Sequence, residues 1–277
     1  CAATMDACME ASGLADAVRG MRRVLLKPNL MRGTAPEACN GTHPAFLAML
    51  VRWFGDREIQ VVVGDSSGLV GFTDQVLDVS GVRDACVQAG AQVVNLDSGP
   101  FRTLAPIGTP PLTFLVPEQL FEVDGYLHVP KFKTHTFLGL TLALKNVMGI
   151  LPGATKPALH EQRPDRDAFA NAVLDLHAAL DREGARCLGA LVDGIWALGG
   201  RGPGIGPRPT RLGLVAAGAD LAAVDMACAL AAGFAPESLP LAQAAIARGL
   251  GPASPENLVV DGPDPDRKST RLNSSHV

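Results

Sequence analysis

The sequence lacks the features that would place it in several specialised classes of protein. Its six cysteines include no C-x-x-C pair, so this stretch contains no zinc-ribbon or ferredoxin-type cluster motif. The longest apolar stretch, residues 212–234, is interrupted by Asp220 and Asp225 and predicts no membrane span. Charged residues make up only 19% of the 277 residues, and the net charge of −4 with interspersed signs argues against a nucleic-acid-binding surface.

The two common phosphate-binding loops are also missing. The glycine-rich stretch 199–209 has neither the G-x-G-x-x-G order nor a G-K-[ST] ending. Three of its residues are prolines, which lack the backbone N–H groups that would hold phosphate. This stretch predicts a rigid connection at the border of a cleft, in which Arg201 is the candidate ligand contact.

Neither end of the chain is expected to be a native end. Residues 266–276 read DRKSTRLNSSH, a polar run that resembles a translated sequencing-library adapter, so residues 266–277 are expected to be a non-native tail. The chain starts at Cys1 instead of Met, so residues 1–21 are expected to be a truncated N-terminal helix of a fragment. A cytoplasmic location is therefore only a default, and an export signal would lie beyond the present N-terminus.

The hydrophobic pattern predicts an α/β fold. Strands at 23–26, 59–63 and 92–96 alternate with helices at 44–54 and 73–89, the order that builds a parallel sheet with crossover helices. The proline-rich middle at 101–116 is less regular and could hold a hairpin or edge strands. After it, the pattern predicts strands at 125–129, 188–192, 212–216 and 257–260, and helices at 140–148, 166–182, 221–232 and 239–247. We therefore expect a single α/β domain over residues 22–265, with a mostly parallel, helix-flanked sheet.

Polar residues follow the ends of these strands. In open α/β sheets, ligands bind at the carboxyl ends of the parallel strands, so the side chains found there are the candidates for a shared cleft. The residues in question are Lys27, Asn29, Asp65, Ser66, Ser67, Asn95, Asp97, Lys131, Lys133, Thr134, His135 and Asp193. Their recurrence after one strand after another predicts a common binding site.

The segment 130–160 is the richest in basic residues. It contains Lys131, Lys133, Lys145, Lys156, His135 and His160, with Asn146 beside Lys145. Lys145 lies in an otherwise apolar helix, where an ammonium group has to reach the surface, pair with a carboxylate or meet an anion. Because lysine acts as a compact positive charge, the cluster favours a small anionic ligand such as a carboxylate or phosphate.

The histidines allow two interpretations. His135 is a candidate general acid or base, because imidazole titrates near neutral pH. His43, His135 and His160 could instead bind a metal ion with Asp65 or Asp193 as oxygen donor, although no pair has the i, i+4 spacing of a helical metal site. His128 and His177 are expected to be structural. Asp220 is expected to cap a helix, whereas Asp225, one turn further on, has no such simple explanation.

Six segments, taken in order, resemble the domain of unknown function 362 family. They are LLKPNL at 25–30, GDSSG at 64–68, PKFKTHTF at 130–137, LALKNVMGILPG at 142–153, DGIWALGGRGPGIGP at 193–207 and GADLAAVD at 218–225. The resemblance marks Lys27, Asn29, Asp65, Lys131, Lys133, His135, Lys145, Asn146 and His160 as motif positions. It implies no established reaction. Members often carry an iron–sulfur domain beside this one, so the resemblance implies a possible ferredoxin-like partner, and a cluster only if a missing flanking domain binds it.

The leading hypothesis is a redox-linked enzyme that acts on a small anionic substrate or cofactor. His135, Asp65 and Lys145 are its candidate catalytic residues, and His160 and His43 are candidate ligands of a possible metal ion. The candidate binding residues are Lys27, Asn29, Lys131, Lys133, Asn146 and Arg201. The alternatives are a non-catalytic anion- or metal-binding module that serves an attached iron–sulfur electron-transfer domain, and a purely structural hydrogen-bond network.

Overall fold

A mostly parallel sheet forms the centre of the computed structural model, which describes residues 2–201 and 205–262. The parallel strands are β1 (Arg23–Pro28), β2 (Gln60–Asp65), β3 (Gln92–Asn95), β6 (Gly125–Val129), β7 (Lys131–His135) and β9 (Cys187–Arg201). The sheet order is β3-β2-β1-β6-β9-β7-β8, in which β8 (Gly139–Thr141) pairs antiparallel with β7. The long β10 (Ile205–Gly218) pairs antiparallel with β9. The predicted α/β class with a mostly parallel sheet is confirmed.

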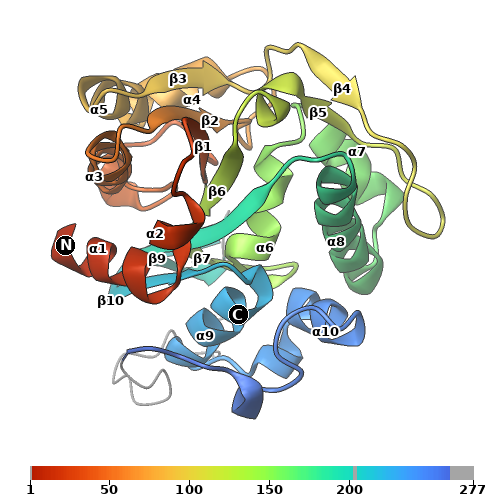
Figure 1. Ribbon diagram of the computed structural model, residues 1–277. Helices are drawn as coiled ribbons and strands as arrows, with labels where there is room; N and C mark the ends of the chain where they lie inside the picture. The colour runs from red at the N-terminus through yellow and green to blue at the C-terminus, as the bar shows by residue number, and fades with distance from the viewer. Residues whose placement is uncertain (1, 202–204, 263–277) are drawn as a thin grey trace.

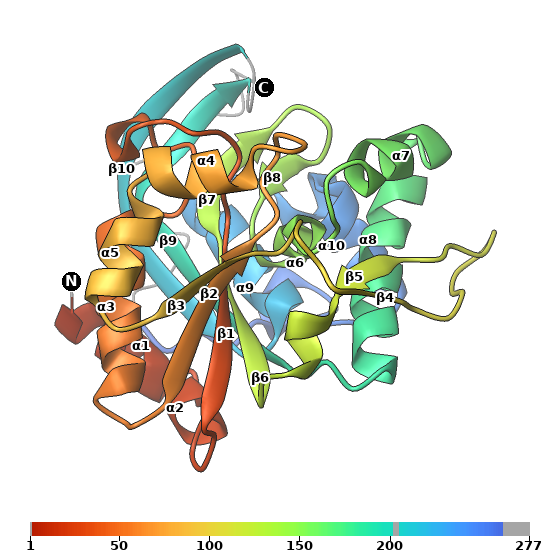
Figure 2. The same ribbon diagram turned by 90° about the horizontal axis from the view of Figure 1, so that it is seen from above.

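Helices cover both faces of this sheet, as Figures 1 and 2 show. In Figure 2, β1, β2, β3 and β6 lie side by side, with α3 and α5 on one flank and α8 on the other. The helices are α1 (Ala2–Ala11), α2 (Leu14–Ala17), α3 (Pro44–Gly55), α4 (Thr73–Val79), α5 (Val82–Gln88), α6 (Ala143–Asn146), α7 (Thr155–Gln162), α8 (Arg166–Arg182), α9 (Leu221–Ala231) and α10 (Pro240–Ala247). Short 3-10 turns occupy Pro36–Ala38, Glu118–Phe121, Val147–Gly149, Pro236–Ser238 and Pro255–Asn257.

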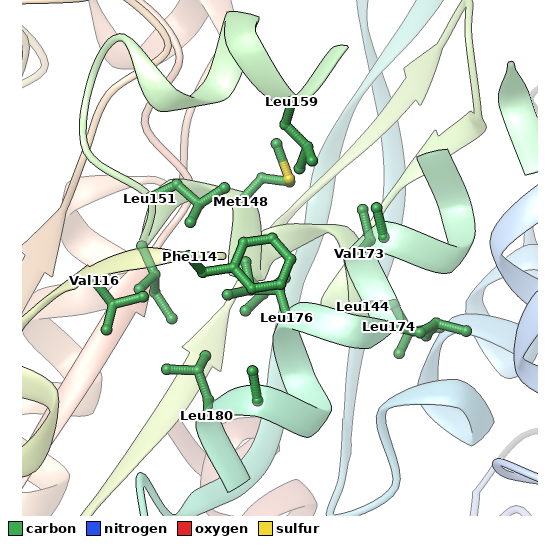
Figure 3. Close-up of a cluster of buried hydrophobic side chains, with 14 of the residues drawn as sticks. Phe114, Val116, Leu144, Met148, Leu151, Leu159, Val173, Leu174, Leu176 and Leu180 are labelled. Atoms are coloured by element: carbon green, nitrogen blue, oxygen red, sulfur yellow. The ribbon is translucent and has the colours of Figure 1, made fainter. Parts of the chain in front are cut away.

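The alternation of side chains along the strands explains why both faces are covered. In β1, Val24 and Leu26 join the core on the side of α1 to α5, whereas Leu25 joins the core on the side of α6, α7, α8 and α10. Strand β2 divides its valines in the same way. Figure 3 shows the second core, where residues of α8 such as Leu176 pack around Phe114. A strand that is buried on both faces can therefore be recognised in the sequence as a continuous run rich in β-branched residues, such as residues 59–63.

The sequence pattern suggests that the chain leaves the sheet after β6, but in the structure it stays in the sheet. Strands β6 and β7 follow each other along β9 and are interrupted only at Pro130, whose carbonyl accepts a hydrogen bond from the N–H of Asp193 at 2.9 Å. Residues 131–135, expected to follow a strand end, therefore form a strand themselves. Because side chains alternate along a strand, Lys131, Lys133 and His135 share one face of β7.

Other element predictions need correction. The expected helix at 73–89 is two helices, α4 and α5, separated at Gly81, whose φ of 72° lies in the left-handed region. The expected helix at 140–148 is the end of β8, the short α6 and a 3-10 turn. The expected strand at 257–260 is wrong: a 3-10 turn ends at Asn257, residues 258–260 have no regular secondary structure, and Val259 is 94% exposed. In contrast, the proline-rich middle agrees with the hairpin that the sequence allowed there, because it holds an antiparallel pair, β4 (Phe101–Thr103) and β5 (Leu115–Pro117).

The N-terminal segment packs against the rest of the fold. Met5 and Met9 of α1 and Leu14 of α2 are buried in the same core cluster as α3. Among the described residues, no helix combines the length and the apolar character that crossing a membrane requires.

Candidate functional site

The candidate site lies where the order of the strands changes direction. Starting from β1, the chain adds β2 and β3 on one side, and then returns to place β6 on the other side of β1. In open α/β sheets, such a switch point opens a crevice at the carboxyl ends of the two diverging strands. Lys27 and Asn29 lie at the end of β1, and β7 continues from the end of β6 with its row of Lys131, Lys133 and His135.

Two buried ion pairs form the floor of this site. Lys27 pairs with Asp65 and Lys131 pairs with Asp193 at 3.0 Å, and all four side chains are at most 1% exposed. The second carboxylate oxygen of Asp65 accepts the N–H of Leu30 at 2.6 Å. Burial lowers the pKa of Lys27 and raises the pKa of Asp65, while the attraction between the two charges opposes both shifts. Each pair is close to neutral overall, so the floor contributes little net charge.

Lys133 and Lys145 have no carboxylate partner among the described residues. Lys133 donates to the carbonyl of Asn40 at 2.8 Å and is 4% exposed. Burial lowers its pKa to about 7, and the positive charge of Lys145 acts in the same direction. Burial also lowers the pKa of Lys145 to about 7, although this side chain is only partly buried. The two lysines thus hold the surplus positive charge of the site, and near neutral pH both can lose it.

The contact between Lys145 and His135 fixes the protonation of both groups. The ring nitrogen Nδ1 of His135 accepts hydrogen bonds from the N–H groups of Phe137 (3.1 Å) and Leu138 (3.2 Å), so Nδ1 carries no proton. A neutral imidazole then carries its proton on Nε2, which lies 2.6 Å from Nζ of Lys145. Because Nε2–H of His135 is then the donor, Nζ of Lys145 accepts the hydrogen bond with the lone pair of a neutral amine.

The pKa of His135 agrees with this arrangement. Burial is the main cause that lowers it to about 2, and the positive charges that Lys145 and Lys133 carry when they are protonated act in the same direction. The imidazole therefore stays neutral at physiological pH and can donate a hydrogen bond, but it does not take up a proton. The role of His135 as a general acid or base stays a prediction.

Lysine itself is distributed unevenly in the chain. The sequence contains six lysines, and Lys27, Lys131, Lys133, Lys145 and Lys156 all belong to this site, whereas the sixth is Lys268. The remaining basic side chains are arginines. Arginine keeps its proton in proteins, whereas a buried lysine can lose it. The site therefore uses the basic residue type that can act as a neutral amine.

The short helix α6 places Lys145 and Asn146, and a residue from another helix holds its start. Asp225 of α9 accepts the N–H groups of Ala143 at 2.7 Å and of Leu144 at 3.1 Å. These are N–H groups of the first turn, which have no partner within a helix. Burial raises the pKa of Asp225 to about 7, against the two hydrogen bonds that favour its carboxylate. The otherwise unexplained Asp225 is therefore the cap of the helix that carries Lys145.

The turn after α6 approaches the ion-paired floor closely. A Cβ atom at Gly149 would overlap with Asp65 Oδ1 and Lys27 Nζ, so this position admits only glycine without a rearrangement. Its carbonyl accepts the N–H of Ser66 at 2.8 Å and so joins this turn to the loop after β2.

The loop after β2 is tied to the site by Lys156 and Asp97. Lys156 donates to the carbonyls of Ser66 (2.6 Å) and Ser67 (2.7 Å), and also contacts the Ser66 hydroxyl. Asp97 accepts from the hydroxyls of Ser66 and Thr73 and from the N–H of Gly153 at 2.7 Å. Burial lowers the pKa of Lys156 to about 8. These contacts engage Lys156 fully in holding the loop.

Of the two asparagines of the motif set, Asn146 is buried and Asn29 is partly buried beside the two ion pairs. Asn146 donates to the carbonyl of Lys27 at 2.8 Å and lies 3.2 Å from Nδ1 of His128. The N–H of Asn29 donates to Thr42 at 2.9 Å. The side-chain carbonyls of both asparagines are buried without a partner in the part of the chain that the structure describes. Each therefore has an acceptor oxygen that no described residue uses.

The two candidate metal ligands, His43 and His160, each make a different structural contact. His43 caps the start of α3, where its Nδ1 accepts the N–H of Ala45 at 3.2 Å. His160 stacks on Phe169, with 4.1 Å between the ring centroids. Within residues 2–201 and 205–262, no three side chains of His, Cys, Asp or Glu form a group that could hold a metal ion. The side chain of Arg201 lies outside the described part of the structure.

The structure thus brings together most of the residues singled out in the sequence, and adds some. Lys27, Asp65, Lys131, Lys133, His135, Lys145 and Asn146 gather at the switch point. Asp65 contacts Lys27, whereas His135 contacts Lys145. Sequence reasoning missed Asn40 and Gly149, whose contribution is a backbone carbonyl or the absence of a side chain and leaves no chemical signal. A separate pocket of about 560 Å³, lined by Arg19, Arg57 and Glu58 among others, lies at the opposite ends of β1 and β2.

Comparisons with known proteins agree with this architecture. A family described as "Domain of unknown function (DUF362)" matches residues 24–230. The thylakoid-associated protein sll1697 of Synechocystis is 27% identical over 260 residues, which cover 90% of this chain and 78% of that protein. Among solved structures, the lactate racemase apoprotein of Thermoanaerobacterium thermosaccharolyticum superposes with a TM-score of 0.54 at 15% identity. That match covers 83% of this chain and 55% of the racemase chain, so it shows a shared fold.

Proposed function

The chain belongs to the DUF362 family, whose description assigns no reaction, and we propose from the site itself that it is an enzyme for a small organic anion. The anion binds beside the protonated Lys133, and the neutral amine of Lys145 is the reacting group. The observation that carries this proposal is the 2.6 Å contact between His135 Nε2 and Lys145 Nζ, together with the two backbone N–H groups that donate to His135 Nδ1.

The charge balance of the site supports an anionic ligand. Once the Lys27–Asp65 and Lys131–Asp193 pairs are matched, the charge of Lys133 has only a backbone carbonyl as its partner. A buried charge without a counter-charge destabilises the folded protein, and an anion that approaches it removes this penalty. Lys145 and His135 are both partly exposed, so they lie where a ligand can reach them from solvent.

The lysine pair divides two tasks between its members. With both pKa values lowered to about 7, chiefly by burial, and with the charge of Lys145 acting against that of Lys133, the state with one proton on the pair is favoured near neutral pH. The hydrogen bond from His135 places the neutral amine at Lys145. Lys133 then binds the anion as a cation, whereas Lys145 is available as a base or a nucleophile without an additional deprotonation step.

A carboxylate is the first choice of anion. The fold is shared with a protein named as a lactate racemase, and lactate is a small carboxylate. For this chain, the choice is part of the proposal, because the likeness extends to the fold alone. The redox link and the ferredoxin-like partner that the family resemblance implies remain predictions, and the proposal does not depend on them.

Calorimetric titration tests the binding half of the proposal. Oxalate, L-lactate and inorganic phosphate are titrated into the protein at about pH 6.5 and about pH 8.5. Because Lys133 binds the anion in its protonated form, the affinity should fall about twentyfold between these values. Lys133→Met should weaken binding and reduce this pH dependence, whereas Arg83→Met, which removes a partly exposed cation paired with Asp74 and Asp78, should change neither. Anions that bind equally well to Lys133→Met would refute the assignment.

Trace acetylation at about pH 7.5 tests the reactive half. A neutral amine reacts with acetic anhydride and an ammonium group does not, so Lys145 should be labelled first and bound oxalate should protect it. If the protein is a binding module without catalytic chemistry, it should bind anions while Lys145 reacts no faster than an ordinary lysine. That result would refute the enzyme hypothesis in favour of the binding module.

A further inference from the structure

We propose that the substrate class of this site is a 2-oxo acid, whose carbonyl carbon Lys145 captures as an imine while Lys133 holds its carboxylate. This inference deepens the proposed function and rests on it. The geometry behind it is the placement of an amine and a neutral imidazole N–H against each other, next to a cation on the same strand.

Lys145 and His135 together provide both partners that a carbonyl group requires. A carbonyl has an electrophilic carbon, which an amine attacks, and an oxygen that gains negative charge during the attack. Nζ of Lys145 supplies the nucleophile, and Nε2–H of His135, 2.6 Å away, supplies a hydrogen bond to the oxygen. Before the ligand enters, the amine and the imidazole form a hydrogen bond with each other. When the ligand enters, its carbonyl oxygen can accept the hydrogen bond from the imidazole in place of the amine.

The carboxylate half of the substrate follows from the spacing along β7. Lys133 and His135 are two residues apart on one face of the strand, so their Cα atoms are separated by about 7 Å. The lysine side chain is long enough to reach toward its neighbour. A carboxylate bound by Lys133 and a carbonyl bound at His135 must therefore be joined within a few atoms, and 2-oxo acids have the two groups on adjacent carbons.

The reaction is balanced without any further reagent. The lone pair of Nζ forms a bond to the carbonyl carbon, and the π electrons move to the oxygen. Both protons of the amine leave with that oxygen as water, and a carbon–nitrogen double bond remains. His135 donates a hydrogen bond throughout and is unchanged at the end, which suits an imidazole whose ring stays neutral.

The other described lysines are engaged in ways that exclude this role. Lys27 and Lys131 are each bound to a carboxylate and buried. Lys133 is 4% exposed and donates to Asn40, and Lys156 donates to several oxygens of the loop after β2. Within the described residues, Lys145 alone combines a histidine partner with access from solvent.

Borohydride trapping tests this inference. The protein is incubated with pyruvate at about pH 7.5, treated with sodium borohydride to reduce any imine, and digested for peptide mass spectrometry. We expect the reduced adduct on Lys145, at least tenfold above any other lysine. L-lactate is the matched control, because it has the carboxylate but no carbonyl and should give no adduct. Lys145→Arg should abolish the adduct, and His135→Phe should lower its yield at least tenfold.

The outcomes separate the two levels of the proposal. If calorimetry shows that pyruvate and oxalate bind and Lys145 gives no adduct, or if the adduct spreads evenly over the lysines, imine formation is refuted and anion binding stands. If neither anion binds, the proposed function fails together with this inference. Circular dichroism and thermal unfolding of each variant identify a loss of folding, and Lys145→Met provides a second test should Lys145→Arg not fold.

Discussion

Replacement of Lys133 by methionine should change how the stability of the protein depends on pH. Burial lowers the pKa of Lys133 to about 7, from an ordinary value of 10.5. Between these values the unfolded chain binds the Lys133 proton more strongly than the folded chain, so the free energy of unfolding rises with pH. From about pH 7 to about pH 9 this linkage amounts to roughly 2 kcal/mol. Lys133→Met removes the titrating group and should lose that increase.

The assay is urea unfolding at both pH values, in which wild type and variant are compared at each. The slope with pH is the informative quantity, because Lys133→Met also leaves the carbonyl of Asn40 without its donor, a pH-independent penalty of about 1–3 kcal/mol. Groups that do not interact with Lys133 titrate equally in both proteins and cancel, whereas the loss of a neighbouring charge raises the pKa of Lys145 in the variant and lowers its slope further. Arg83→Met is the control and should keep the wild-type slope. Equal slopes in wild type and Lys133→Met would refute the claim that Lys133 is a buried, uncompensated cation.

Two further substitutions test the framework of the site. Asp225→Asn should weaken oxalate binding in calorimetry about fivefold, equivalent to ~1 kcal/mol, because α6 loses part of its cap. Asp225 lies in α9, and Asp220→Asn, at the start of α9, is the control and should leave the affinity unchanged. Equal effects of both would argue against capping. Gly149→Ala should destabilise the protein by about 3 kcal/mol or more in urea unfolding, because the new Cβ overlaps with the buried ion pair that joins β1 to β2. Gly55→Ala, with open space around it, should be neutral or stabilising; a neutral Gly149→Ala would contradict the close approach.

The sequence was sufficient to predict the part of the fold that depends on local hydrophobic pattern. The β-branched run before Asp65 indicates a strand buried on both faces, and polar residues past such strands indicate the edge where ligands bind. Strand β7 was missed for a physical reason. Its residues Lys131 and Lys133 are buried and His135 is partly buried on one face of the strand, although buried faces are normally apolar. A strand with polar residues on its buried face has the sequence pattern of a loop.

The partners of the charged residues could not be predicted, because each contact joins segments far apart in the chain. Asp65 lies beside Lys27 only because β1 and β2 are neighbours in the sheet. The role of His135 depends on which of its ring nitrogens meets the backbone, which composition and spacing do not reveal. Asp225 could be recognised as unusual, but its function became visible only when α9 was placed against α6.

The central claim is that Lys145 is a neutral amine at physiological pH, and an NMR titration of lysine side chains tests it most directly. With only six lysines in the chain, the ¹³Cε signals of ¹³C-lysine-labelled protein can be resolved and assigned by single substitutions, with Lys145→Arg identifying Lys145. The account predicts a titration midpoint for Lys145 at about pH 7. A midpoint near 10.5, the ordinary value for lysine, would contradict it.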